Sequence, residues 1–237
     1  MITVSYYIIN GKKHFVTNGG FADYLLVLVS TEPGTGHRGL SMVIVEKDTP
    51  GFAVGRHELK LGIRGSDTSE LLFDNCRIPQ ANLLGEEGRG LKMTLTILDG
   101  GRIGIAAQAL GIAQAAYDDA VAYAKERTQF GKPIAEFQAV AFKLAEMATE
   151  LEAARLLTYK AAWLKDQGED YMVASSMAKL YASEASIRIT NEAIQIHGGY
   201  GYIRDFNVER YYRDARITTL YEGTSEIQRL VISKSYL

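Results

Sequence analysis

This 237-residue sequence has only one cysteine, no large excess of either charge and no long apolar run. Its single cysteine, Cys76, cannot form an intrachain disulfide, which excludes a disulfide framework and favours a reducing compartment. Lysine and arginine number 26 against 28 acidic residues, so the basic excess typical of nucleic-acid-binding proteins is missing. No apolar run reaches the roughly 18 residues that span a bilayer, and the first residues do not resemble a secretory signal. These absences predict a soluble cytoplasmic protein with neither a nucleic-acid nor a membrane partner.

Proline is also scarce, and its distribution divides the chain. Three of the four prolines precede residue 82, among short apolar runs broken by glycine and asparagine. The segment 6–16 predicts a β-hairpin, because Asn10-Gly11 supplies the positive φ angles of a two-residue type I′ turn. Further buried strands are predicted at 25–29, 41–45 and 70–73. Residues 1–82 therefore predict an antiparallel sheet or small barrel.

After about residue 88 the apolar pattern becomes helical. From Phe137 to Leu164, apolar residues recur at alternating steps of three and four, which places them on one stripe of a long helix. Such a stripe needs partner helices, for which 90–127 and 171–196 are the candidates. A last helix is predicted from Ser225, where Ser225 and Gln228 match a capping box. We therefore predict an α+β fold, mainly α, in which a partial antiparallel β-domain precedes an up-down four-helix bundle over 83–237.

Two glycine-rich helix ends each have a structural and a functional interpretation. Arg127 precedes Phe130-Gly131, which is either a basic helix end with a stop signal or an arginine placed to bind a phosphate. Gly198-Gly199 is either a helix cap or a stretch where a cofactor lies against bare backbone. The preceding His197 is interpreted as a packed or partly exposed side chain rather than a ligand. The four histidines lack metal-ligand spacing, so no metal site is predicted.

Two further motifs also remain open at this level. Glu222 precedes a glycine in a loop where a carboxylate could reach a cleft, and Thr224 starts a helix whose free N–H groups would favour an anion. The same segment also reads as an ordinary loop and capped helix. Gly100-Gly101 lies inside a helical run at a cost of about 1 kcal/mol per glycine relative to alanine, which indicates close approach by a helix or a ligand.

The order of four motifs carries more information than any one of them. They are Phe15-Val16-Thr17-Asn18-Gly19-Gly20, Arg127-x-x-Phe130-Gly131, Gln195-x-x-Gly198-Gly199 and Tyr221-Glu222-Gly223-Thr224-Ser225-Glu226. Together they resemble the acyl-CoA dehydrogenase family over nearly the whole chain, and residues 98–106 are most similar to its short-chain, butyryl-CoA-type members. The resemblance implies a partial middle β-domain at 1–82 and a C-terminal helical domain at 83–237 that binds FAD and oligomerises.

The resemblance also implies an activity, the FAD-dependent α,β-dehydrogenation of a short-chain acyl-CoA to the trans-2-enoyl-CoA. Glu222 matches the base that removes the α-proton, while the flavin takes the β-hydrogen as hydride and passes electrons to an electron-transfer flavoprotein. Some members place the base at the position of Gly101. Glycine cannot act as a base, so Glu222 has no competitor.

The family's binding roles carry over residue by residue. FAD contacts are implied for Phe15, Val16, Thr17, Arg127, Phe130, Gln138, Gln195, Gly198, Gly199, Thr224 and Glu226. Acyl-CoA contacts are implied for Asp99, Arg102, Tyr221 and Gly223. Arg127 and the stretch from Gln195 to Gly199 are expected to reach the FAD of a neighbouring subunit in a homodimer or tetramer. Many members carry Trp where this chain has Phe15, so its stacking surface is smaller but still aromatic.

The main departure from the family lies at the front of the chain. Family members carry an N-terminal helical domain and further β-domain residues before the Phe15 segment, and this sequence has neither. Two alternatives to the dehydrogenase therefore stay open: a truncated, non-catalytic assembly module, and an acyl-CoA oxidase that gives its electrons to oxygen. The resemblance implies a cytoplasmic location, or the mitochondrial matrix in a eukaryote.

Overall fold

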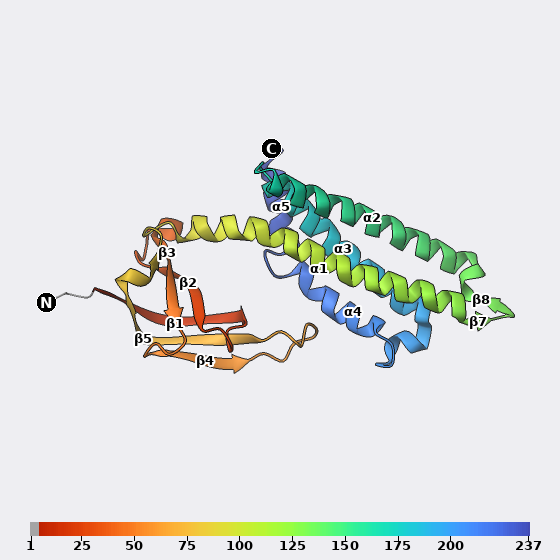
Figure 1. The fold of residues 1–237 in the computed structure, drawn as a ribbon, viewed down its shortest axis with the longest axis horizontal. Coiled ribbons are helices and arrows are strands. Elements are labelled where there is room, and N and C mark those ends of the chain that lie inside the picture. Colours follow the sequence, from red (N-terminus) through yellow and green to blue (C-terminus); the bar gives the residue numbers. More distant parts are fainter. Residues whose placement is uncertain (1–4) are drawn as a thin grey trace. The chain divides into compact units, whose positions relative to one another are not determined.

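The computed structural model describes residues 5–237, which form two compact units (Figure 1). One unit runs to Lys60 and continues over Arg64–Ile97, and the other comprises Leu61–Ile63 and Leu98–Leu237. Strands fill the first unit and helices dominate the second. The predicted fold class, a partial antiparallel β-domain followed by a helical bundle, is therefore confirmed.

The first unit contains two small antiparallel sheets. One has the strand order β1-β5-β4 and the other the order β2-β3-β6. Their bounds are β1 Tyr6–Thr17, β2 Tyr24–Ser30, β3 Leu40–Glu46, β4 Phe52–His57, β5 Thr68–Pro79 and β6 Leu83–Leu84. The apolar runs predicted as strands lie in β2, β3 and β5, while β4 and β6 were not predicted.

A single apolar core joins the two sheets. Buried side chains come from β1, β2, β3 and β5: Ile9, Leu25, Val27, Val43, Val45, Leu71, Phe73, Cys76 and Ile78. Along β5 the buried positions change phase between Phe73 and Cys76, where Asn75 adopts a positive φ of 49°. A bulge inserts one residue there, so both halves of the strand keep their apolar side chains on the core side.

The predicted hairpin at residues 6–16 is wrong, because the two halves form one continuous strand. Tyr6 to Thr17 all belong to β1, which pairs antiparallel with β5 throughout. Asn10 lies opposite the bulge of β5, and its side-chain oxygen accepts a hydrogen bond from the Asn75 amide at 2.7 Å. The Asn-Gly signal therefore marks an irregular register rather than a chain reversal.

The second unit is a helical bundle with a short strand pair at one end (Figure 1). The helices are α1 Gly90–Glu126, α2 Gln138–Asp166, α3 Met172–His197, α4 Val208–Ala215 and α5 Ser225–Lys234. Strands β7 Thr128–Gln129 and β8 Lys132–Pro133 pair between α1 and α2. Short 3-10 helices occur in both units: Gly36–Gly39 and Gln80–Asn82 in the first, and Ile134–Glu136, Gly198–Tyr202 and Arg216–Thr219 in the second. In the part of the chain that the structure describes, no helix is long and apolar enough to cross a membrane.

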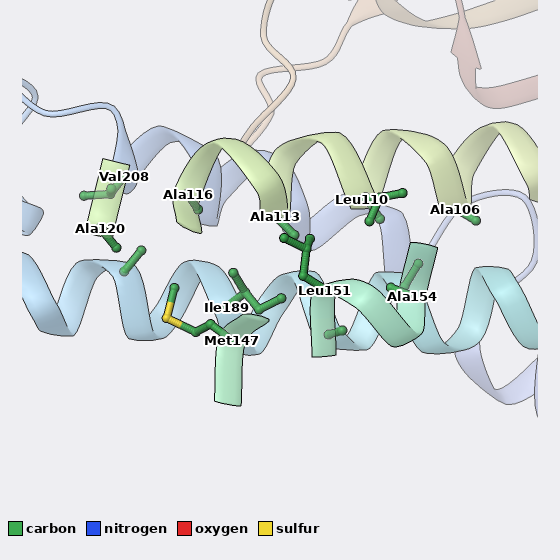
Figure 2. Close-up of a cluster of buried hydrophobic side chains, with 14 of the residues drawn as sticks. Ala106, Leu110, Ala113, Ala116, Ala120, Met147, Leu151, Ala154, Ile189 and Val208 are labelled. Atoms are coloured by element: carbon green, nitrogen blue, oxygen red, sulfur yellow. The ribbon is translucent and has the colours of Figure 1, made fainter. Parts of the chain in front are cut away.

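Small side chains let the long helices approach closely. Every buried core residue of α1 except Leu110 is alanine, and these alanines recur at steps of three and four: Ala106, Ala109, Ala113, Ala116, Ala120 and Ala124. Larger residues of α2 and α3, including Met147, Leu151 and Ile189, pack against them (Figure 2). The predicted α2 stripe is confirmed, since Met147, Leu151, Ala154 and Ala161 are all buried.

Two local features of the bundle differ from the prediction. The cap of α5 is Thr224 rather than Ser225, because the Thr224 side chain accepts a hydrogen bond from the Ile227 amide and Ser225 is already helical. Helix α4 was not predicted. Its eight residues bury only Val208 and Ala215, so the segment carries too few apolar positions for a periodic pattern to show.

Candidate active site

The predicted base, Glu222, lies on a tight turn that precedes α5. Its φ is +53°, and the next residue, Gly223, has a φ of +88°. Two successive residues with positive φ form a tight turn, and only glycine adopts a positive φ without a steric cost. Thr224 then caps α5. The backbone of Glu222 is thus held in a conformation that residues other than glycine rarely adopt.

The Glu222 carboxylate lies over α1 at Gly101. A Cβ atom placed on Gly101 would come within 2.7 Å of the carboxylate oxygen Oε2. Gly101 therefore makes room for this side chain, whereas a Cβ on Gly100 would lie 3.2 Å from the Lys165 ammonium. Side chains of the protein thus approach both glycines. Within residues 5–237 no protein group hydrogen-bonds to the carboxylate. It is thus free to accept a proton from a bound molecule.

A buried polar cluster lies around this turn. The ammonium of Lys179, a fully buried residue of α3, donates to the Gly223 carbonyl at 2.6 Å. The side-chain amide of Gln228, also fully buried, donates to the same carbonyl at 3.0 Å and to the Glu222 carbonyl at 3.3 Å. Burial is the main reason that the pKa of Lys179 falls to about 8. Two donors on two helices therefore hold the backbone that follows the base.

The predicted substrate residues Asp99 and Arg102 lie one helical turn apart on α1. The Arg102 guanidinium, only 4% exposed, donates to the Asp99 carboxylate at 2.7 Å and to the Ser176 hydroxyl at 3.1 Å. Burial raises the pKa of Asp99, and the charge of Arg102 opposes that rise. The Arg102 Nε atom is buried and has no partner in the described part of the chain. The guanidinium thus keeps one buried donor unused.

Tyr221, the third predicted substrate residue, is tied to α1. Its hydroxyl makes a hydrogen bond with the side-chain oxygen of Gln108. Burial is the main cause that raises the pKa of the Tyr221 phenol, so this group stays protonated at neutral pH. Residues 221–223 are thereby anchored to α1 by Tyr221 and to α3 by Lys179.

The second group of predicted residues surrounds a separate cavity of about 500 Å³. Arg127, Gly198 and Gly199 all line it, together with Tyr123 and His197. Nothing lies within 4 Å of where a Cβ would stand on Gly198 or Gly199, so their backbone faces open space. The Arg127 guanidinium, at 5.7 Å from the Tyr200 ring centre, is exposed. The cavity combines a free cation with bare backbone, which suits a phosphate-bearing ligand.

Three more predicted cofactor residues lie on the surface at this end of the bundle. Phe130 is 93% exposed with a φ of +52°, and Gln138 and Gln195 are exposed as well. By contrast, His197 is packed as predicted: its ring stacks on Tyr123 with centres 4.2 Å apart, and Nδ1 bonds with the Ala193 carbonyl. Burial lowers the pKa of His197. In residues 5–237 no group of three metal-ligating side chains occurs.

The Glu222 site and the Arg127 cavity lie far apart along α1. Gly101, which faces Glu222, and Glu126, which precedes Arg127, are 25 residues apart on this helix, or about 37 Å at 1.5 Å per residue. Thr224 and Glu226 belong to the Glu222 end, and Gln195 and Gly198 to the Arg127 end. The structure therefore does not bring all predicted cofactor residues together within one copy of the chain.

Phe15, Val16 and Thr17 belong to the first unit, where β1 is irregular. The register against β5 shifts between Lys13 and Val16, and Phe15 has a φ of +58° and is 73% exposed. A bulge of this kind redirects a side chain out of the regular alternation of a strand. Asp67 fixes the turn after β1, because its carboxylate accepts from the Gly20 amide at 2.9 Å and its carbonyl from the Asn18 amide.

Sequence reasoning missed several residues that shape these sites. Lys179, Gln228 and Gln108 were not among the predicted site residues, and neither was Asp67. One signal for Lys179 was available: it is a lone lysine within the alanine- and serine-rich stretch 174–186 of a helix expected to be buried. Gln108 and Gln228 gave no comparable signal, since glutamine is common on helix surfaces.

Comparison with known proteins shows the family of the chain. The family model of the acyl-CoA dehydrogenase C-terminal domain matches residues 88–237, and that of the middle domain matches residues 2–76. An acyl-CoA dehydrogenase of Bacillus subtilis (strain 168) is 56% identical over 231 residues, covering 98% of this chain and 61% of that protein. A mitochondrial short-chain specific acyl-CoA dehydrogenase of Mus musculus is 54% identical, over 96% of this chain and 55% of its own length.

A solved structure gives the same result. That of butyryl-CoA dehydrogenase from Megasphaera elsdenii has a TM-score of 0.96 at 50% identity, covering 98% of this chain and 60% of its own. This chain thus spans about three fifths of the length of the proteins it matches. With family models matching both of its units, the chain belongs to the acyl-CoA dehydrogenase family.

Proposed function

We propose that this chain carries the catalytic base of an FAD-dependent dehydrogenase that converts a short-chain acyl-CoA to the trans-2-enoyl-CoA. The observation that carries the proposal is the Glu222 carboxylate, which has no protein partner in the described residues and lies over Gly101 on a constrained turn. Such a carboxylate can take a proton from the α-carbon of a bound thioester. Among the relatives, the Mus musculus protein is named short-chain specific and the Megasphaera elsdenii structure is a butyryl-CoA dehydrogenase.

The residues present fit FAD. Arg127 supplies a fixed charge for the pyrophosphate beside the bare backbone of Gly198 and Gly199, and the N-terminus of α5 at Thr224 offers free N–H groups. Phe15 offers an exposed aromatic ring. When bound, FAD supplies the hydride acceptor that the twenty side chains lack. A related structure, 33% identical with a TM-score of 0.94, is described as PigA with FAD and proline.

The other predicted residues would orient the substrate. Arg102 would donate a hydrogen bond to the substrate from its unpartnered Nε. Asp99 lies beside Arg102, and Tyr221 and Gly223 flank the base Glu222. An acyl-CoA is the substrate, and an electron-transfer flavoprotein is the electron acceptor that we propose. One related chain, 51% identical, comes from a structure described as an electron transferring flavoprotein of Acidaminococcus fermentans. We also propose a cytoplasmic location, or the mitochondrial matrix in a eukaryote, as the name of the mouse relative suggests.

We further propose that the FAD site is shared between copies of the chain in a dimer or tetramer. The roughly 37 Å between the two groups of cofactor residues supports this, because one ligand would have to reach both ends of α1. A neighbouring copy could present its Arg127 cavity to the Glu222 end of the first. Domain limits of 1–82 for the β-domain and 83–237 for the FAD-binding, oligomerising bundle complete the proposal.

The test is a visible absorption spectrum of the purified chain with FAD, before and after anaerobic addition of butyryl-CoA. We expect a flavin band that bleaches, and we expect Glu222→Gln to retain the band but lose the bleaching. The substitution removes the base while nearly preserving its shape, so a structural defect would not explain the loss. Bleaching by the variant at the wild-type rate would contradict the assignment of the base.

One observation favours a second candidate, a non-catalytic assembly module. The helical bundle has an apolar core of its own, which would let it fold and self-associate whether or not FAD binds. A chain that self-associates but shows no flavin band with added FAD would support this candidate. An oxidase is a third candidate, since a prolyl acyl carrier protein oxidase, AnaB, is 42% identical with a TM-score of 0.94. Rapid peroxide formation in air after reduction would identify it.

A further inference from the structure

Lys179 is a buried cation with an unusual partner. It lies in the middle of α3, is fully buried, and directs its ammonium to the carbonyl oxygen of Gly223 at 2.6 Å. In residues 5–237 no carboxylate comes within 4 Å of this nitrogen. A lysine is rarely buried without a paired carboxylate, because the ammonium loses its hydration on burial. A packing role alone would be served equally by methionine, so the charge and the donor call for another explanation.

The carbonyl that Lys179 binds belongs to the turn that carries Glu222. Glu222 and Gly223 both have positive φ, and the Gly223 carbonyl also accepts from the Gln228 amide at 3.0 Å. Because a positive φ is sterically unfavourable for Glu222, the turn needs other contacts to stabilise it. Lys179 of α3 and Gln228 of α5 supply those contacts from two different helices.

The charged groups that act on Lys179 lie on α1, α3, α5 and the turn before α5. Arg102 of α1 opposes its positive charge, whereas Glu222, Glu226 and Glu184 favour it. Desolvation nevertheless dominates and brings the pKa of Lys179 to about 8, so the group is mostly charged at neutral pH.

We propose that Lys179 is a positioning residue for Glu222, which it serves by clamping the Gly223 carbonyl so that the carboxylate is held over Gly101. This inference rests on the proposed function of Glu222 as the base. It assigns to Lys179 no contact with substrate or cofactor. The clamp acts through the backbone, at the Gly223 carbonyl.

Hydrogen exchange of the chain without FAD tests the clamp independently of activity. In Lys179→Met, which removes the donor at similar volume, we expect the amides of 219–226 to exchange about tenfold faster, while those of α2 stay unchanged. Lys160→Met, at an exposed position of α2, is the matched control and should leave 219–226 unchanged. Exchange at the wild-type rate in Lys179→Met would overturn the proposal.

If Lys179→Met fails to fold, the wild-type chain decides the question. Raising the pH from 7 to 9.5 crosses the pKa of about 8 and discharges the ammonium. After correction for the intrinsic rate, protection of 219–226 should fall several-fold relative to α2, because a neutral amine is a weaker donor. Protection that does not change relative to α2 would contradict the clamp.

The flavin-bleaching assay provides the second readout. We expect Lys179→Met to lower the rate of bleaching at saturating butyryl-CoA about tenfold and to change the half-saturating concentration less than about twofold. Lys179→Arg, which keeps a charged donor, should lose less of this rate than Lys179→Met. Should bleaching be absent even in the wild type, the proposed function fails while hydrogen exchange still decides the clamp.

Discussion

Single residues with unusual backbone angles coincide with the predicted sites. Six non-glycine residues in the described chain have a positive φ, and three of them are predicted site residues: Phe15, Phe130 and Glu222. None of the three is asparagine or aspartate, the types that tolerate this region, so each costs of order 1 kcal/mol or more. Local strain is retained where it directs a functional side chain, which supports the roles proposed for them.

Asp67 is a residue whose ionisation should matter for stability. Its carboxylate accepts hydrogen bonds from His57 at 2.8 Å, from the Gly20 amide and from Ser69. The bond from His57 is the largest of the causes that lower the pKa of Asp67 from 3.8 to about 2. Since the folded state binds the proton more weakly than the unfolded state, the carboxylate stabilises the fold above pH 3.8, and this contribution disappears as the pH falls through about 2.

We therefore expect Asp67→Asn to lower the free energy of unfolding at pH 7. The difference from wild type should shrink between about pH 4 and pH 2, since both chains then carry a neutral group at this position. Urea denaturation at a series of pH values measures it. The control is Asp48→Asn, in an exposed turn. A difference that persists undiminished at pH 2 would show that the ionised carboxylate is not responsible.

At the scale of elements, the sequence predicted what depends on a repeated pattern. The α2 stripe, the α3 end at Gly198 and three strands follow from periodicity and glycine placement, and the structure confirms them. The predicted hairpin is wrong because the Asn10-Gly11 sequence suits both a hairpin turn and a position opposite a bulge. Which of the two forms depends on the distant strand β5, which offers β1 a partner along its length.

The N-terminus of α5 shows the same limit of local reasoning and provides a test. Thr224 caps the helix through its hydroxyl, while the Ser225 hydroxyl is buried and unpartnered in the described chain. Thr224→Ala should therefore destabilise the chain by about 1 kcal/mol, and Ser225→Ala by less than about 0.5 kcal/mol. Urea unfolding without FAD compares the two variants. Equal losses, or a larger loss at Ser225, would restore the capping box predicted from sequence.

At the scale of the whole molecule, the sequence identified site residues but not their distribution. Motif order alone cannot show that Arg127 and Glu222 lie far apart along α1. About 25 residues of this helix separate them, and the sequence carries no signal for which groups lie beside each part of the helix. The distribution gives the proposed self-association of the chain a specific role. Each copy would supply a base at one end and a phosphate-binding arginine at the other.

Complementation between two inactive variants tests this shared site. Arg127→Ala should retain FAD poorly and Glu222→Gln should bind FAD without bleaching, so each alone is inactive. In a mixed dimer, the Glu222 of the first variant meets the Arg127 of the second, which rebuilds one intact site. Random mixing of equal amounts should then restore about a quarter of the wild-type bleaching amplitude, because half of the dimers are mixed and each holds one intact site of two.

The matched control pairs Glu222→Gln with Arg77→Ala, whose exposed arginine lies on β5 and is not among the predicted site residues. This mixture should bleach in proportion to its Arg77→Ala chains alone. No recovery in the first mixture, with subunit exchange shown by sedimentation of tagged chains, would contradict a site shared between copies.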